Sequence, residues 1–119
     1  LKALSIIQAE LDKDPNYRAV IAGDFNEVLE MDESKNQLSV KFFIDAGLID
    51  ACAGTEKYTY NKKPYLSRID FALCTKSLAS EILKADIIDS LQGVELKCAS
   101  DHYPVLVEFG VSDNGQEKL

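Results

Sequence analysis

The stretch S-D-H-Y-P-V at Ser100–Val105 leads directly into the run V-L-V-E-F at Val105–Phe109. The run has the apolar, β-branched character of a strand, and the proline just ahead of it is typical of a strand's first position. The stretch carries His102, the only histidine of the chain, directly after Asp101. Isolated histidines are mostly structural, but an imidazole beside a carboxylate at the mouth of a strand is a candidate catalytic group.

Two further strings place an acid at the polar end of a short apolar run. G-D-F-N at Gly23–Asn26 follows A-V-I-A, and S-R-I-D at Ser67–Asp70 opens the run I-D-F-A-L-C. Ligands of α/β sheets bind at such strand ends. Each string alone has a simpler explanation: Asp24 is typical of a turn or helix cap, and Arg68 with Asp70 of a surface ion pair.

Hydrolysis of a phosphate ester is the chemistry that uses this set best. It needs carboxylates for a divalent metal, a group that orders or deprotonates water, and donors for the charge on phosphorus. Asp24 could polarise the water while the Asn26 amide donates to a phosphoryl oxygen. Asp70 is a partner for His102, whose tautomer a carboxylate would fix, which leaves Asp101 to face a metal.

Composition limits the alternatives. The 119 residues allow one domain, and 46% hydrophobic residues allow a core. The net charge of -7 argues against a broad basic surface for nucleic acid, although bound metal would supply local positive charge. The one concentrated basic stretch, Lys62-Lys63 with nearby Arg68 and interleaved tyrosines, is either a backbone-binding loop or a solvated one. Cysteines Cys52 and Cys74 lie in apolar surroundings and are expected to be buried small hydrophobes.

Periodicity predicts alternating helices and strands, an α/β architecture. We expect helices over residues 1–13, 38–46 and 76–83, and strands over 19–22, 57–60, 69–74 and 105–109. Residues 85–91 are expected to form a strand or an extended segment, 48–51 a short edge strand or a loop, 27–36 a loop and 61–64 a turn. Strand 19–22 is expected to be buried on both faces, and Gly47 to cap the second helix. The strands are few, so one face of the sheet is expected to lack a cover, as in part of a longer protein.

The three motifs, in this order, resemble the C-terminal half of the endonuclease/exonuclease/phosphatase superfamily, the DNase I-like fold. The resemblance covers about residues 1–110, and residues 111–119 are expected to form a polar, disordered tail. It implies the C-terminal half of a four-layered α/β sandwich, here one mostly antiparallel sheet with flanking helices. It also implies hydrolysis of phosphate esters with Mg²⁺ or Mn²⁺.

The resemblance also implies roles for individual residues. Asp24 would orient or deprotonate the water, and Asn26 would stabilise the phosphorane. Asp70 would hold His102, which would contact the scissile phosphate, while Asp101 would help to bind the metal. Arg68 and Tyr60 are the expected substrate contacts, because aromatic residues in this loop pack near a nucleotide in the endonuclease branches.

The family's N-terminal half supplies an Asn and a metal-binding Glu that have no counterpart here. We therefore expect the chain alone to be a weak or inactive catalyst, and its open sheet to be covered by the missing half or by a second chain. Nucleic acid is the favoured substrate. The alternatives are a lipid or small phosphoester, and a non-catalytic interaction module that forms homo-oligomers. The sequence assigns no compartment.

Overall fold

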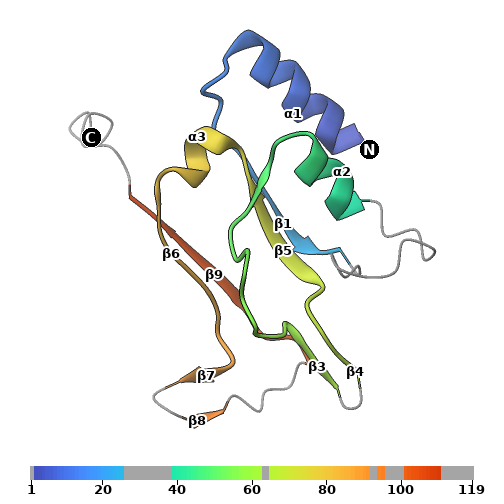
Figure 1. Ribbon diagram of the computed structural model, residues 1–119, viewed down its shortest axis with the longest axis vertical. Coiled ribbons are helices and arrows are strands. Elements are labelled where there is room, and N and C mark those ends of the chain that lie inside the picture. The colour runs from blue at the N-terminus through green and yellow to red at the C-terminus, as the bar shows by residue number, and fades with distance from the viewer. Residues whose placement is uncertain (1, 26–38, 63–64, 92–93, 96–100, 111–119) are drawn as a thin grey trace.

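The structure is a computed structural model, and it describes residues 2–25, 39–62, 65–91, 94–95 and 101–110. Helices and strands alternate along the described chain (Figure 1). In order they are α1 (Lys2–Lys13), β1 (Val20–Asp24), α2 (Ser39–Asp45), β2 (Ile49–Asp50), β3 (Tyr60–Lys62), β4 (Tyr65–Ser67), β5 (Asp70–Cys74), α3 (Lys76–Ala79), β6 (Ile82–Ile87), β7 (Ser90–Leu91), β8 (Val94–Glu95) and β9 (Val105–Phe109).

A three-stranded sheet in the order β1-β5-β2 holds the centre of the molecule. Both outer strands run antiparallel to β5, and Ala22 lies opposite Ala72. The strands pair further as β3-β4, β6-β9 and β7-β8, all antiparallel. The expected α/β class with antiparallel strands is confirmed. Within the described residues, the strands form four small sheets and not the single sheet that was expected.

The hydrophobic core lies between this sheet and helices α1 and α2, which flank β1 and β5 in Figure 1. Successive strand residues point to opposite faces, so alternate residues of β1 and β5 reach the helices. The buried members of the core are Ile7, Val40, Phe43, Leu48, Phe71 and Leu73, with Ile21 and Phe25 packed against them. The helical periodicity of residues 1–13 therefore predicted α1 and its buried face correctly.

The opposite face of the sheet is open along β1, and here the expectation for strand 19–22 was wrong. Val20 is 45% exposed. Ile21 is half-buried, and the other residues of β1 are exposed. A continuous apolar run predicts burial on both faces only when something covers each face. An open groove of about 430 Å³ runs along this face between β1, β5 and β9. Apolar side chains such as Val20, Val107 and Phe109 line it.

Helix α2 ends at a glycine, as expected. The N–H of Gly47 donates to Ile44 at 2.9 Å and that of Leu48 to Phe43 at 3.0 Å, the bond pair of a Schellman motif. Gly47 has φ 101°, a left-handed conformation that side chains with a Cβ rarely adopt. The cap directs the chain from α2 into the edge strand β2.

Several element boundaries differ from expectation. The segment expected to be extended over 85–91 forms two strands, β6 from Ile82 to Ile87 and β7 at Ser90–Leu91. The strand expected at 57–60 begins only at Tyr60, because Thr59 is held by bonds to other segments. Pairing with β4 then extends it to Lys62, into the expected turn. The helix expected over 76–83 ends at Ala79, since β6 begins at Ile82 to pair with β9. The expected loop 27–36 and the tail 111–119 lie outside the described residues.

The cysteine prediction is confirmed for the described pair. Cys52 and Cys74 are buried and form no disulfide, and burial is the main cause that raises the pKa of both thiols. Cys98 lies outside the described residues. No helix in the described part of the chain is long and apolar enough to cross a membrane.

Candidate functional site

Two strand ends bring carboxylates together at one edge of the central sheet. Asp24 is the last residue of β1 and Asp70 the first of β5, and the register places them directly opposite each other. Residues opposite each other in an antiparallel pair share a face, and like charges there repel. Such a pair is maintained where a cation or a proton donor lies beside it. The two motifs that the sequence singled out are therefore neighbours in space.

His102 lies beside both carboxylates. Its Nδ1 is 2.8 Å from Oδ2 of Asp70, and its Nε2 is 3.9 Å from Oδ2 of Asp24. The Asp70 side chain is 16% exposed, whereas those of His102 and Asp24 are 35% and 49% exposed. One imidazole nitrogen is thus held by a mostly buried carboxylate, and the other is directed to the more open side of the site. In the neutral ring, this arrangement favours the tautomer with the proton on Nδ1.

The surroundings favour the protonated form of His102. Its pKa is raised, first by the hydrogen bond to Asp70, and further by the negative charges of Asp70, Asp24 and Asp101; partial burial opposes the shift. An imidazole in this setting carries a positive charge at higher pH than an ordinary histidine. It can therefore stabilise negative charge or donate a proton near neutral pH.

Asp24, Asp70 and His102 also form a group that could hold a metal ion. One ligand atom from each residue lies within 4.8 Å of the others. Mg²⁺ prefers oxygen ligands, so the carboxylates suit it better than the imidazole, whose Nδ1 is already bonded to Asp70. Asp101, the metal ligand expected from sequence, is not part of this group within the described residues.

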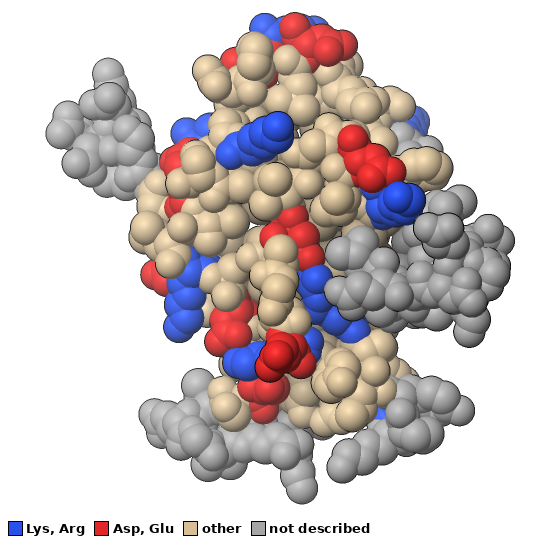
Figure 2. All heavy atoms as spheres, viewed as in Figure 1, with Lys and Arg blue, Asp and Glu red and all other residues tan. Residues whose placement is uncertain are grey.

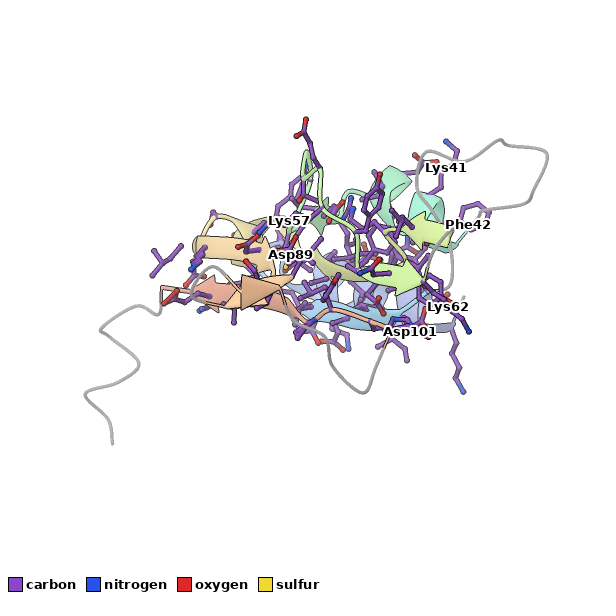
Figure 3. The ribbon with its side chains drawn as sticks, turned by 90° about the horizontal axis from the view of Figure 1, so that it is seen from below. Lys41, Phe42, Lys57, Lys62, Asp89 and Asp101 are labelled. Atoms are coloured by element: carbon purple, nitrogen blue, oxygen red, sulfur yellow. The ribbon has the colours of Figure 1, made fainter. Side chains whose placement is uncertain are left out.

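Asp101 precedes His102 in the chain, and Tyr60 packs against the His102 ring. The Asp101 side chain is exposed, at the same edge of the molecule as Lys62 in Figure 3, and its carbonyl accepts a bond of 2.8 Å from the Asn61 N–H. Tyr60 packs edge-on against the imidazole with ring centroids 5.2 Å apart, and its backbone bridges to His102. Tyr60 therefore contacts the candidate catalytic ring, while its contact with a substrate stays a prediction.

The Arg68 side chain is mostly buried and is hydrogen-bonded within the protein. Its guanidinium forms two bonds to the Asp50 carboxylate, one of them 3.1 Å long, and lies 4.5 Å from the centre of the Phe71 ring. The Arg68 side chain is 14% exposed and the Asp50 side chain is 4% exposed. The sequence suggested a surface ion pair with Asp70 or a substrate contact. The structure gives Arg68 a different partner and a buried position, and a substrate contact by Arg68 stays a prediction.

Asn26 lies outside the described residues, so its expected role stays a prediction. Its neighbour Phe25 packs edge-on against Phe43 and Phe71, which anchors the chain just after Asp24. The backbone N–H of Phe25 also donates to the Ile69 carbonyl at 2.9 Å. The end of β1 is therefore fixed both by aromatic packing and by a bond to the segment that precedes Asp70.

Sequence reasoning missed two buried polar residues that support the site, Asp50 and Thr59. Asp50 stands alone in an apolar segment, and that isolation was a usable signal, because a buried charge needs a partner. Thr59 carried no such signal, since threonine is ordinary in an alternating strand.

Lys57 was also missed. It bonds Asp86 at 3.0 Å and lies 3.5 Å from Asp89, and Figure 3 shows it beside Asp89.

The charges around the site are mixed. Figure 2 shows acidic and basic side chains interspersed over the face that it presents, without a continuous basic area among the coloured residues. This agrees with the net charge of -7. The open groove ends at the site, because Asp70 and Tyr103 contribute to its lining. The candidate site therefore sits at one end of the uncovered sheet face.

Comparison with known proteins shows a likeness in fold. No family model matches the chain, and no curated protein sequence matches it. Among solved structures, it matches the 3′ phosphatase NExo from Neisseria, a variant bound to its product DNA hairpin, with a TM-score of 0.65 and 19% sequence identity. The chain shares the fold of part of that structure. The match covers 92% of this chain and 51% of the Neisseria chain.

The match covers only part of the Neisseria chain, and the sheet of this structure is covered only in part. The chain spans about half the length of the Neisseria 3′ phosphatase chain that it matches. In the described residues, helices cover one face of the sheet, and the other face is open along β1. The open groove along β1 is consistent with a match to only about half of the Neisseria chain.

Proposed function

We propose that this chain forms the C-terminal half of a divalent-metal-dependent phosphoesterase, with nucleic acid as its substrate. The observation that carries the proposal is the meeting of Asp24, Asp70 and His102, with Nδ1 of the imidazole 2.8 Å from Asp70. Their motifs lie far apart in the sequence. The fold shared with a 3′ phosphatase supports the same reaction class.

Each residue has a role that its position supports. Asp24, the most exposed of the three, orients or deprotonates the attacking water. Asp70 holds His102 by Nδ1, so that Nε2 is presented to the phosphate as a proton donor or as positive charge. Asn26, two residues beyond Asp24, donates to a phosphoryl oxygen in this proposal.

The metal in this proposal is Mg²⁺ or Mn²⁺. The described residues offer it carboxylate oxygens, foremost that of Asp24, and the proposal adds Asp101 as a second ligand. When bound, the ion would neutralise charge on the phosphate oxygens and lower the pKa of water. The remaining oxygen ligands would come from the half of the fold that this chain does not span.

The same half-domain is the proposed cover of the open groove. Val20, Val107 and Phe109 present apolar surface there, next to Asp70. Burial of apolar surface stabilises by about 25 cal/mol per Å², so a second half packed on the groove would be held by the hydrophobic effect. It would also complete the metal site at the groove's end.

Nucleic acid is the preferred substrate, because Tyr60 lies against His102 and can stack on a base. The Neisseria enzyme is itself bound to DNA. A lipid or small phosphoester is the competing substrate, favoured by the net charge of -7. A non-catalytic interaction module is favoured only by the open groove.

A substrate panel tests the proposal. The chain, alone and within its full-length protein, is assayed with Mg²⁺ on 3′-phosphorylated and abasic oligonucleotides, plasmid, sphingomyelin vesicles and inositol phosphates. We expect cleavage of nucleic acid, reduced about 10²- to 10⁴-fold by His102→Ala, the size typical of general acid–base groups. Lys41→Ala, which alters only the exposed pair with Asp45, is the matched control.

The panel also separates the alternatives. Turnover of sphingomyelin or inositol phosphates alone would move the substrate class from nucleic acid to lipids or small molecules. Complete inactivity of the full-length protein, with bound metal undetectable, would contradict the proposal and favour the interaction module.

A further inference from the structure

Thr59 is one of few polar residues that the described core buries completely. A buried hydroxyl needs hydrogen-bond partners, because leaving it unsatisfied is costly. The Thr59 Oγ1 accepts from the backbone N–H of Ile69 at 2.9 Å and from that of Asp70 at 3.1 Å. One side-chain oxygen thus binds the two amides at which β5 begins.

The backbone of the same residue binds the segment that carries His102. The Thr59 carbonyl accepts from the Tyr103 N–H at 2.7 Å, and the Thr59 N–H donates to Ser67 at 3.1 Å. The following residues extend this template: Tyr60 bridges to His102, and Asn61 bonds both Asp101 and the Tyr103 hydroxyl. Thr59 is therefore bonded to Asp70 itself and to the residue after His102.

The third site residue is reached through one more peptide. Ile69, whose N–H is held by Thr59, accepts a bond of 2.9 Å at its carbonyl from Phe25, the neighbour of Asp24. A displacement of the start of β5 would therefore change the positions of Asp70 and Asp24 together. Active sites lose much of their rate when groups move by about 1 Å.

We propose that Thr59 is a positioning residue, whose buried hydroxyl and carbonyl together fix Asp70 against Nδ1 of His102. The catalytic consequence rests on the proposed function, but the geometric claim does not. Thr59 contacts neither substrate nor metal in this proposal. It acts by holding the two amides before and at Asp70 and the amide after His102 in one frame.

The test compares three variants of the 119-residue chain by NMR. Thr59→Val removes the hydroxyl at nearly constant shape, and Thr59→Ser retains it. Thr75→Val is the matched control, because Thr75 is equally buried at the other end of β5 and its Oγ1 accepts from the Ala19 N–H at 3.1 Å. His102 is the only histidine, so its ring ¹⁵N signals are unambiguous.

At one pH where the ring is neutral, we expect wild type, Thr59→Ser and Thr75→Val to show the Nδ1-protonated tautomer. Thr59→Val should show a mixture of tautomers and faster hydrogen exchange at Ile69 and Asp70. A wild-type ring spectrum in Thr59→Val, or an equal change in Thr75→Val, would overturn the inference. If Thr59→Val does not fold, wild-type exchange decides: amides of Ile69 and Asp70 must be as protected as those in mid-β5, and rapid exchange overturns the inference.

In active full-length protein, Thr59→Val should lower kcat by about tenfold to a hundredfold with little change in KM, and Thr59→Ser should restore it. Unchanged kcat in Thr59→Val would overturn the catalytic consequence. Absence of any phosphoesterase activity in wild type would instead contradict the proposed function, and the NMR comparison would still decide the role of Thr59.

Discussion

At the scale of single residues, the protonation of His102 depends on the carboxylate that holds it. Asp70 is the main cause that raises its pKa above 6.5, and Asp101 is the least of the contributing charges. We expect Asp70→Asn to lower the pKa of His102 markedly and Asp101→Asn to lower it less. An NMR titration of the single imidazole measures both. An unchanged pKa in Asp70→Asn would show that the 2.8 Å contact is not formed in solution.

The same shift links stability to pH. Because the pKa of His102 is higher in the folded chain than in the unfolded one, the pair stabilises the fold fully below the ordinary value of 6.5. This contribution is lost as pH rises through the folded pKa. We expect urea unfolding to show the loss in wild type and a smaller loss in Asp70→Asn, because Asp24 and Asp101 still raise the pKa of His102. The effect is small, since His102 is 35% exposed and solvent screens the interaction.

The Asp50–Arg68 pair is the residue-scale determinant of stability. Removing one partner of a buried ion pair leaves an uncompensated charge and typically costs about 3–5 kcal/mol. We expect Asp50→Leu to lower the free energy of unfolding by this amount, and Asp50→Leu with Arg68→Met to recover much of it. Lys41→Ala, at an exposed pair with Asp45, should change it by less than about 0.5 kcal/mol. Equal losses of unfolding free energy in Asp50→Leu and Lys41→Ala would contradict the buried pair.

At the scale of secondary structure elements, the end of α2 sets the path into β2. Gly47 has φ 101° and no atom within 4 Å of the place where a Cβ would lie, so backbone strain alone determines the effect of a substitution. We expect Gly47→Ala to cost about 1–2 kcal/mol, and Gly47→Asn less, because asparagine tolerates this region. Urea unfolding measures both. A neutral Gly47→Ala would mean that the last turn of α2 adopts another conformation.

At the scale of the whole molecule, the open groove is the surface on which the proposed second half would pack. Val20 is 45% exposed on that face, and Ile6 is 55% exposed on α1, on the opposite side of the sheet. In the isolated chain, Val20→Ser should change the free energy of unfolding by less than about 0.5 kcal/mol. In a longer protein that contains the proposed second half, we expect a cost of about 1.5–3 kcal/mol, because that half would bury the valine.

Ile6→Ser is the control and should have the same small effect in both proteins. An equally small effect of Val20→Ser in the full-length protein would show that nothing packs on the groove. On the same grounds, we expect the chain alone to turn over substrate much more slowly than the full-length protein with Mg²⁺.

Local patterns were sufficient for much of the fold and for part of the site. Strand 105–109, helix α1 and the cap at Gly47 follow from periodicity and from backbone preferences, which act over a few neighbouring residues. The motifs that carry Asp24, Asp70 and His102 were recognised for the same reason, since each places a polar group at the end of an apolar run. Their closeness followed from the resemblance, and the register of β1 with β5 accounts for it.

The amino-acid sequence by itself determined that β1, β5 and β9 are strands and that Asp24 and Asp70 stand at the ends of the first two. Only the tertiary structure decided that Arg68 binds Asp50, 18 residues away, and that the Thr59 hydroxyl holds Ile69 and Asp70. It also decided that β1 is covered on one face only. The physical reason is range: strand and helix preferences are local, whereas a buried charge or hydroxyl takes whichever partner the packed chain brings within about 3 Å.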